Sequence, residues 1–459
     1  MKVLQICSYL YPALAYGGPA KVVFELSKQL SKKHIVTIFT TDVWDESRRI
    51  SSAEKLQNFR QLKVVYFPNI FNTLAYTMRF FSGFGMIPAF LRQSKNFEVI
   101  HIHDVYIIPQ LCIAVLANIF GKPYVITTHG VLDPVRLKKK SAIKQLLWPL
   151  AKFTLQHARV VIAVSENEAK ILRSLGINSV YMVSNGIADV RVQPSAKFKK
   201  YASKKLITLL YVGKIHPQKG LKNLLLALEK SPESKYQLLI AGPDDGQLNE
   251  LLQITQKLNL ANVHFLGFVN ERQKQELFSL SNLFVYPSYA EGFSISILEA
   301  MQAGLPVLIT QACNFQTVEE NKAGYVVSNK NLTHQIKMVL RSTQLTKAQL
   351  NFKGQKARRL QQQAYTVDHV AKLHEKLYMT INPSTSDQDQ LEEFHKLIFR
   401  HPNILKKYLA FVRFNQMKKQ KQSSFYQYLH PIQMFTFVAF VSVEVCFSFF
   451  YKLKAKYLL

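Results

Sequence analysis

Two glutamates, Glu291 and Glu299, stand close together in the stretch AEGFSISILEAMQAGLPVLIT, residues 290–310. Paired carboxylates can act as an acid and a base, or they can hold the hydroxyl groups of one elongated ligand. The stretch predicts a loop that carries Glu291 and a helix, residues 294–303, that carries Glu299. Eight helical steps would separate the carboxylates by roughly 12 Å along the axis, whereas glycosidase pairs lie about 5–9.5 Å apart. The spacing therefore favours two hydroxyl-binding groups with a phosphate between them, which is the layout of a nucleotide sugar.

Two lysines in the stretch YVGKIHPQKG, residues 211–220, could supply positive charge to such a phosphate. Lys214 and Lys219 follow a predicted buried strand and precede a predicted helix. Ammonium groups at the carboxyl end of a parallel strand can neutralise a diphosphate and stabilise it as a leaving group. Two solvated lysines are the alternative in so basic a chain, and the position at the strand end is what favours a function.

A glycine loop and three histidines mark strand ends in the first half of the chain. Gly17 and Gly18 come between the first predicted strand and a helix, where glycines allow a close backbone approach to a diphosphate. A flexible loop is the alternative there. His129, in the segment THG, could bond a sugar hydroxyl or a phosphate. For His101 and His103 a structural role is at least as well supported, and the spacing of the histidines does not suit a zinc site.

These loops require sheets whose strands end at a common edge. The first half of the chain alternates predicted strands and helices, and a second alternating series begins after a basic, polar linker at residues 194–205. Such alternation predicts two parallel α/β sheets, with a ligand-binding cleft between the strand ends of two domains. The predicted strands are 3–7, 35–41, 62–67, 99–103, 124–128 and 160–164 in the first series, and 207–212, 237–241, 263–266, 283–286 and 307–310 in the second.

Composition narrows the class of protein. The 459 residues are 48% hydrophobic, which supports large cores, and the formal net charge is +30. Basic residues are scattered along the chain rather than gathered into a nucleic-acid-binding motif. The charge therefore indicates a basic surface that either keeps the protein soluble or contacts an anionic membrane. The four cysteines are isolated and fit a reducing compartment. The first residues predict a buried strand rather than a signal peptide.

The segment after residue 383 has a different composition. It lacks the α/β alternation, is rich in aromatic residues and carries an excess of Lys and Arg. Its apolar run, residues 431–451, is just long enough to span a bilayer, but Glu444 is costly in hydrocarbon. We therefore expect association with a membrane surface, and spanning and interfacial binding both stay open.

The motifs together resemble the family 4 glycosyltransferases, which are retaining enzymes with the GT-B fold of two facing Rossmann-like domains and a deep cleft between them. The resemblance covers the chain up to the basic tail. Its specific part is the two-glutamate motif, which opens with EGF and closes with AGLPV. The glycine loop and the segments THG, SNGI and GK…KG match more loosely. The segment THGVLDP is similar to that of members that build exopolysaccharide or surface glycans.

The resemblance implies three segments along the chain before the tail. Residues 1–193 would be an N-terminal Rossmann-like acceptor domain, and residues 194–364 a C-terminal Rossmann-like nucleotide-sugar domain. Residues 365–382 would be a helix that returns to the N-terminal domain. Residues 383–459 lie beyond the resemblance, and from their composition we expect a helical, basic and aromatic appendage that associates with a membrane.

The resemblance also implies roles for the two-glutamate motif. Glu299 would bind the ribose of the donor nucleotide, and Glu291 would contact the hydroxyls of the donor sugar. The backbone at Gly292, Phe293 and Ser294 would support the sugar and the phosphate.

The remaining site residues would surround the diphosphate and the sugar. Lys219 would stabilise the departing diphosphate. Lys214 stands where the family usually has arginine, so a single ammonium replaces a planar fork. Gly17 and Gly18 would line the diphosphate from the N-terminal domain, and His129 would lie near the donor sugar.

In function, the resemblance implies hexose transfer from a UDP- or GDP-sugar to a glycan or lipid-linked glycan, with retention of anomeric configuration and without a metal or cofactor. The acceptor hydroxyl would attack from the face of the leaving group. The reaction would serve surface polysaccharide synthesis at the cytoplasmic face of the membrane, with no nucleic-acid partner. Two alternatives stay open: an epimerase or inverting transferase on the same fold, and a non-enzymatic basic protein that binds nucleic acid or a membrane.

Overall fold

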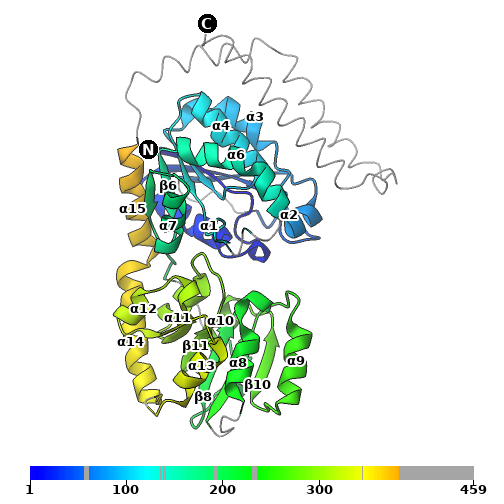
Figure 1. Cartoon of the computed structure of the whole chain (residues 1–459). Helices are drawn as coiled ribbons and strands as arrows, with labels where there is room; N and C mark the ends of the chain where they lie inside the picture. Colours follow the sequence, from blue (N-terminus) through cyan, green and yellow to red (C-terminus); the bar gives the residue numbers. More distant parts are fainter. Residues whose placement is uncertain are drawn as a thin grey trace, which may run out of the picture. The chain divides into compact units, whose positions relative to one another are not determined.

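The computed structural model describes residues 1–55, 61–134, 137, 141–189, 195–229, 235–343 and 345–381. These residues form two parallel β-sheets with helices beside them (Figure 1). The predicted α/β class with two Rossmann-like domains is therefore confirmed. The predicted tail at residues 383–459, with its apolar run at 431–451, lies outside the described residues. Among the helices that are described, none has the length and the apolar character that crossing a bilayer requires.

The first sheet has seven parallel strands in the order β3-β2-β1-β4-β5-β6-β7. Most of its strands are rich in Val and Ile and are buried on both faces, as expected where helices cover both sides of a parallel sheet. The strands are β1 (Lys2–Ile6), β2 (Ile35–Thr41), β3 (Leu62–Phe67), β4 (Val99–His103), β5 (Tyr124–Thr127), β6 (Val160–Ala163) and β7 (Val180–Met182). The helices are α1 (Pro19–Leu30), α2 (Asn72–Met78), α3 (Met86–Gln93), α4 (Ile108–Ile119), α6 (Ser141–His157) and α7 (Glu166–Ser174).

The second sheet has six parallel strands in the order β10-β9-β8-β11-β12-β13. The strands are β8 (Ile207–Val212), β9 (Tyr236–Ala241), β10 (Val263–Gly267), β11 (Leu283–Tyr286), β12 (Val307–Thr310) and β13 (Gly324–Val327). The helices are α8 (Leu221–Leu228), α9 (Leu248–Lys257), α10 (Glu271–Leu280), α11 (Ile295–Gln302), α12 (Thr317–Glu320), α13 (Leu332–Arg341) and α14 (Lys347–Ala364).

Each sheet has one point at which the strand order reverses. It lies between β1 and β4 in the first sheet and between β8 and β11 in the second. In doubly wound sheets, ligands bind outside the carboxyl ends of the strands at this reversal. The loops that follow β8 and β11 are the ones that carry Lys219 and Glu291, so the topology itself brings these two residues together.

The last described helix, α15 (Val367–Thr380), packs on the first sheet's side of the molecule although it follows α14 of the second (orange in Figure 1). It lies against α1, and Val370, Ala371 and Tyr378 are buried in the hydrophobic core of the first sheet. A helix of the C-terminal part of the chain therefore contributes side chains to the interior of the N-terminal sheet.

Two edge strands and part of the linker differ from the sequence prediction. We did not predict β7 or β13, because β7 is short and exposes Tyr181 and Met182, each 51% accessible, and β13 begins with Gly324. The segment 194–205 was predicted to be a linker. Its described part is anchored instead, since Phe198 is buried in the core of the second sheet and its backbone N–H donates to Glu276 Oε1 at 2.7 Å.

Candidate active site

Two loops at the reversal of the second sheet are bonded to each other. The loop after β8 ends at Gly220, and the loop after β11 begins at Pro287. The Tyr289 N–H donates to Gln218 O at 2.8 Å, and Gln218 Nε2 donates to Ala290 O at 3.3 Å. A Cβ at Gly220, where φ is +69°, would lie 2.1 Å from the Pro287 carbonyl oxygen. This position therefore requires glycine, and the close approach fixes Lys219 next to the second loop.

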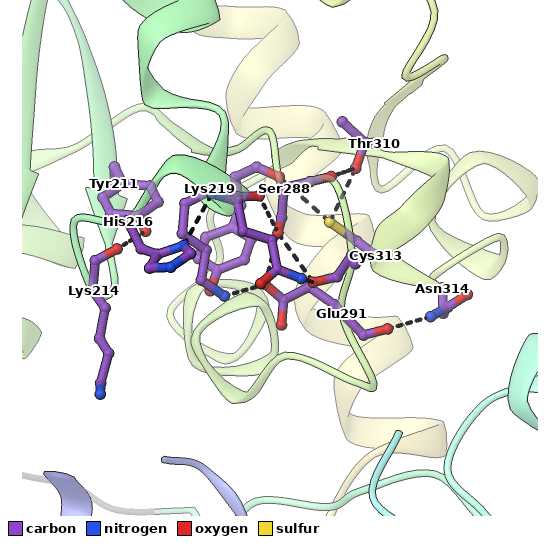
Figure 2. A network of polar contacts seen from close by, with 12 residues as sticks. Tyr211, Lys214, His216, Lys219, Ser288, Glu291, Thr310, Cys313 and Asn314 are labelled. Atoms are coloured by element: carbon purple, nitrogen blue, oxygen red, sulfur yellow. Dashed lines mark hydrogen bonds and ion pairs between the residues drawn. The ribbon is translucent and has the colours of Figure 1, made fainter. Parts of the chain in front are cut away.

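Lys219 and Glu291 form an ion pair at the centre of these loops (Figure 2). The Lys219 ammonium contacts Glu291 Oε1, to which the Ser288 hydroxyl also donates at 2.8 Å. The Asn314 amide donates to the Glu291 carbonyl oxygen at 2.6 Å, so both the side chain and the backbone of Glu291 are held. Glu291 is only 6% exposed, and electrostatic interactions are stronger at such a buried position than in water.

Glu299, on α11, belongs to a separate ionic cluster. Its Oε1 accepts from Lys21 Nζ of α1 at 2.7 Å, and its Oε2 accepts from Lys274 Nζ of α10 at 2.7 Å. Glu271 completes the cluster, at 3.0 Å from Lys274 and 3.5 Å from Lys21. Burial acts to raise the pKa of Glu299, but the Lys274 and Lys21 ammonium groups outweigh it and hold the pKa below its usual value. Glu291 and Glu299 thus have different cationic partners, which suits two binding groups better than one acid/base pair.

Lys214 lies apart from Lys219, although both belong to one loop. In Figure 2 its side chain extends away from the Lys219–Glu291 pair. The ammonium lies 4.0 Å from Asp245 Oδ2 and 5.5 Å from the ring centre of Tyr76, on α2 of the N-terminal domain. Burial lowers the pKa of Lys214 below its usual value. The two lysines therefore supply charge at two places rather than one.

The glycine loop after β1 lies against the start of α11. Gly17 has φ +110°, a conformation that favours glycine, and Gly18 is the residue before the first turn of α1. A Cβ at Gly18 would lie 3.0 Å from Ile295 Cγ1. The predicted diphosphate-binding loop of the N-terminal domain thus lies next to the helix that carries Glu299.

The loop of His129 lies next to the Glu291 loop. A Cβ at Gly292 would lie 2.8 Å from the His129 carbonyl oxygen and 3.1 Å from Gly130 Cα. The buried carboxylate of Glu168 holds the His129 loop, because its Oε1 accepts from the Thr128 hydroxyl and from the Gly130 N–H at 2.5 Å each. His129 has φ +51°, which is uncommon for residues other than glycine, although histidine adopts it more readily than most.

The backbone of the Glu291 loop also accepts a hydrogen bond from the N-terminal part of the chain. Asn185 Nδ2 donates to the Phe293 carbonyl oxygen at 3.3 Å. Ser294 is the residue before the first turn of α11 and is 7% exposed, but within the part of the chain that the structure describes its side chain makes no capping hydrogen bond. The segment from Gly292 to Ser294 is thus positioned by contacts from both sides.

Four residues of this arrangement were not predicted: Lys21, Lys274, Ser288 and Asn314. Lys21, Lys274 and Asn314 each reach a predicted site residue from another loop or helix, and Lys21 is 278 residues from its partner Glu299. Ser288 reaches Glu291 from within the same loop. Lys21 lies three positions after Gly18, so its place in the first turn of a helix that follows a glycine loop was the available signal. For Asn314 and Lys274, neither the residue type nor the spacing from a motif indicated a place in the site.

The chain matches two models of known protein families. Residues 16–191 match the family model described as Glycosyltransferase Family 4, and residues 192–365 match the model described as Glycosyl transferases group 1. The two matches together cover well over half of the chain.

Individual relatives agree with these matches. The GDP-mannose:cellobiosyl-diphosphopolyprenol alpha-mannosyltransferase of Xanthomonas oryzae pv. oryzae (strain PXO99A) is 26% identical over 347 residues, which are 72% of this chain and 84% of the relative. The O-antigen chain mannosyltransferase C of Escherichia coli is 24% identical over 84% of this chain and 100% of its own length. The crystal structure of Anabaena HepE in complex with UDP and glucose superposes with a TM-score of 0.63 at 19% identity, over 83% of this chain and 100% of HepE.

Proposed function

Because the chain belongs to the family 4 glycosyltransferases and is a hexosyltransferase with the GT-B fold, we propose that it transfers a hexose from a UDP- or GDP-sugar with retention of anomeric configuration and without a metal ion. The acceptor is a glycan or a lipid-linked glycan. The observation that carries this proposal is the Lys219–Glu291 ion pair. The pair brings Lys219, which would bind the diphosphate, into contact with Glu291, which would bind the sugar hydroxyls. The bond between sugar and phosphate would therefore lie next to both residues.

The donor spans three parts of the site in this proposal. Glu299 binds the ribose hydroxyls, and the glycine loop of Gly17 and Gly18 lines the diphosphate together with the start of α11, which it contacts. Glu291 and His129 hold the sugar, with the backbone of Gly292, Phe293 and Ser294 beneath it. Lys214 provides a second positive charge, on the side of the site that faces Tyr76 of the N-terminal domain.

The reaction then needs charge stabilisation more than an acid. Negative charge grows on the diphosphate as the glycosidic bond breaks, and Lys219 stabilises that charge more strongly in the transition state than in the ground state. The acceptor hydroxyl attacks from the face of the leaving group, and a phosphate oxygen takes its proton. No carboxylate nucleophile is required, which agrees with Glu291 being held by Lys219 and Ser288.

The relatives support a role in surface glycan synthesis. One is named for a diphosphopolyprenol-linked acceptor and GDP-mannose, another for O-antigen chains, and the HepE structure holds UDP and glucose. We propose a lipid-linked acceptor and a site of action at the cytoplasmic face of the membrane, with the basic residues of the tail as the membrane contact.

A donor screen tests the proposal. Purified full-length protein is incubated with UDP-, GDP- and ADP-sugars in EDTA, and nucleotide release and product anomer are measured. Nucleotide release from one UDP- or GDP-sugar, with a product of the donor's anomeric configuration, is expected. Activity that disappears in EDTA and returns with Mg²⁺ or Mn²⁺ would refute metal independence, and a product of inverted configuration would assign an inverting transferase.

A further inference from the structure

A continuous chain of buried hydrogen bonds runs from His129 to α15. His129 Nε2 lies 3.1 Å from His103 Nδ1, and His103 Nε2 lies 2.7 Å from Gln5 Oε1. Gln5 Nε2 donates to the Tyr378 hydroxyl at 3.2 Å, and that hydroxyl lies 2.6 Å from His101 Nδ1. Each of these side chains is buried. The chain therefore connects a predicted donor-site residue to α15, which packs against α1 in the core of the first sheet.

The direction of each bond follows from the amide of Gln5. Its Oε1 can only accept, so His103 Nε2 carries the hydrogen. Burial lowers the pKa of His103 well below its usual range, so the ring is neutral and its Nδ1 has only a lone pair. His129 Nε2 must then donate to His103 Nδ1.

The same reasoning settles the other nitrogen of His129. Burial lowers the pKa of His129 to about 3, so this ring is also neutral, and with its hydrogen on Nε2 it has a lone pair on Nδ1. Across the described ranges, no hydrogen-bond partner lies within reach of Nδ1, although the atom is buried. A buried acceptor without a donor has lost its hydration without compensation, so it calls for a functional explanation.

We propose that Tyr378, Gln5 and His103 are positioning residues that fix the tautomer of His129, so that Nδ1 accepts a hydrogen from a hydroxyl of the donor sugar. This inference rests on the proposed function, and it adds that a helix from the C-terminal part of the chain controls the chemistry of a site histidine. The backbone contact of His129 with Gly292 places the residue beside the loop assigned to the sugar. A sugar hydroxyl can donate a hydrogen bond. With the tautomer fixed, Nδ1 of His129 can only accept, so it selects a group that donates a hydrogen bond at that point.

Tyr378→Phe tests the inference, because it removes the hydroxyl and frees the Gln5 amide to turn over. ¹⁵N NMR of histidine-labelled protein reports which ring nitrogen of His129 carries the hydrogen, with the His129→Asn spectrum providing the assignment. We expect a single Nε2–H tautomer in the wild type and a mixture in Tyr378→Phe. Donor turnover should fall about fivefold, the effect of one hydrogen bond of average strength, while UDP or GDP affinity stays unchanged.

Tyr124→Phe is the matched control. Tyr124, on β5 of the first sheet, is as fully buried as Tyr378, and its hydroxyl donates to Thr154 O at 2.7 Å rather than to the chain that leads to His129. Its loss should leave the tautomer and kcat as they are. If the loss of any buried tyrosine hydroxyl of this domain lowered kcat by loosening the fold, Tyr378→Phe and Tyr124→Phe would lower kcat by similar factors.

A second variant tests the route through His129. Asn tolerates the left-handed backbone at this position and offers an amide oxygen where Nδ1 stands, without a tautomer. In a His129→Asn background, Tyr378→Phe should therefore cause no further loss of kcat, and a multiplicative loss would overturn the proposal. An unchanged tautomer in Tyr378→Phe would overturn it too. A wild-type protein that turns over no donor would instead refute the proposed function and the sugar as ligand, while the NMR result would still show whether Tyr378 sets the tautomer.

Discussion

Glu299 lies between two lysines, and this determines how its assigned role can be tested. Replacement by alanine would leave Lys21 and Lys274 with Glu271 as their shared anionic partner, whereas Glu299→Gln keeps the shape and one acceptor oxygen. We expect Glu299→Gln to weaken nucleotide binding by about 1–3 kcal/mol, because a carboxylate that accepts from ribose hydroxyls is replaced by a neutral amide. Titration calorimetry with UDP and GDP measures this.

The control for this substitution is Glu271→Gln. Glu271 shares both lysines with Glu299 but is more exposed and has no assigned contact with the donor. Its replacement should leave nucleotide affinity nearly unchanged. Equal losses in the two variants would mean that the ionic cluster, rather than a ribose contact, determines the affinity.

Lys219 should affect turnover more than binding. Lys219→Ala removes the cation that faces the growing charge of the diphosphate, so kcat should fall by about a hundredfold or more while the donor affinity changes less. Lys222→Ala is the matched control, because Lys222 is an exposed lysine of the same region that pairs with Glu250. Steady-state kinetics on both variants separates kcat from KM, and similar small effects in the two would contradict the leaving-group role.

At the scale of elements, the contact between the Glu291 and His129 loops leaves no room for a side chain at Gly292. Gly292→Ala would bring a Cβ within 2.8 Å of the His129 carbonyl oxygen, which is backbone and cannot turn aside. We expect a large loss of activity with an unchanged far-UV circular dichroism spectrum. Gly18→Ala should be milder, because its Cβ would meet side-chain atoms of Ile295, at 3.0 Å from Cγ1, rather than backbone. The reverse order of severity would show that this contact does not shape the site.

The sequence predicted the elements whose signal is local. Buried strands such as β8 and β11 have continuous apolar runs, and the loops that follow them carry Lys219 and Glu291 as expected. The edge strand β7 escaped prediction because it is three residues long and partly exposed. Contacts such as Lys21 with Glu299 could not be predicted, since they depend on how elements far apart in sequence pack together. For the same reason the histidine chain to Tyr378 appears only in the structure.

At the scale of the whole molecule, the buried histidines couple stability to pH. Burial lowers the pKa values of His101 and His103 well below their usual range, that of His129 to about 3 and that of His374 to about 4. The unfolded chain binds protons at these residues below about pH 6.5, whereas the folded chain stays neutral there. The free energy of unfolding should therefore be fully retained above pH 6.5 and should fall as the pH drops from 6.5 towards 4, by up to about 1.4 kcal/mol per pH unit for each histidine.

Denaturant unfolding at a series of pH values measures this dependence. His374→Phe removes one of the four groups and should make the slope below pH 6.5 shallower. His369→Gln, on the exposed face of the same helix, should leave the slope unchanged. A wild-type stability that does not vary between pH 6.5 and 4 would contradict the assignment of buried neutral histidines.

The last prediction concerns the tail, which lies outside the described residues. Both sheets and α15 are complete before residue 382, so a chain that ends at Asp387 keeps every element of the candidate site. Residues 391–459 carry an excess of Lys and Arg and the apolar run 431–451. Each basic residue near an anionic surface adds about 1 kcal/mol of attraction. We therefore expect the truncated protein to lose flotation with anionic liposomes but to keep transfer to a soluble acceptor. Transfer to a lipid-linked acceptor in liposomes should fall, because the enzyme is no longer concentrated at the surface. Unaltered flotation would assign membrane contact to the first domain instead, and a truncated chain that fails to fold would show that the tail is part of the core.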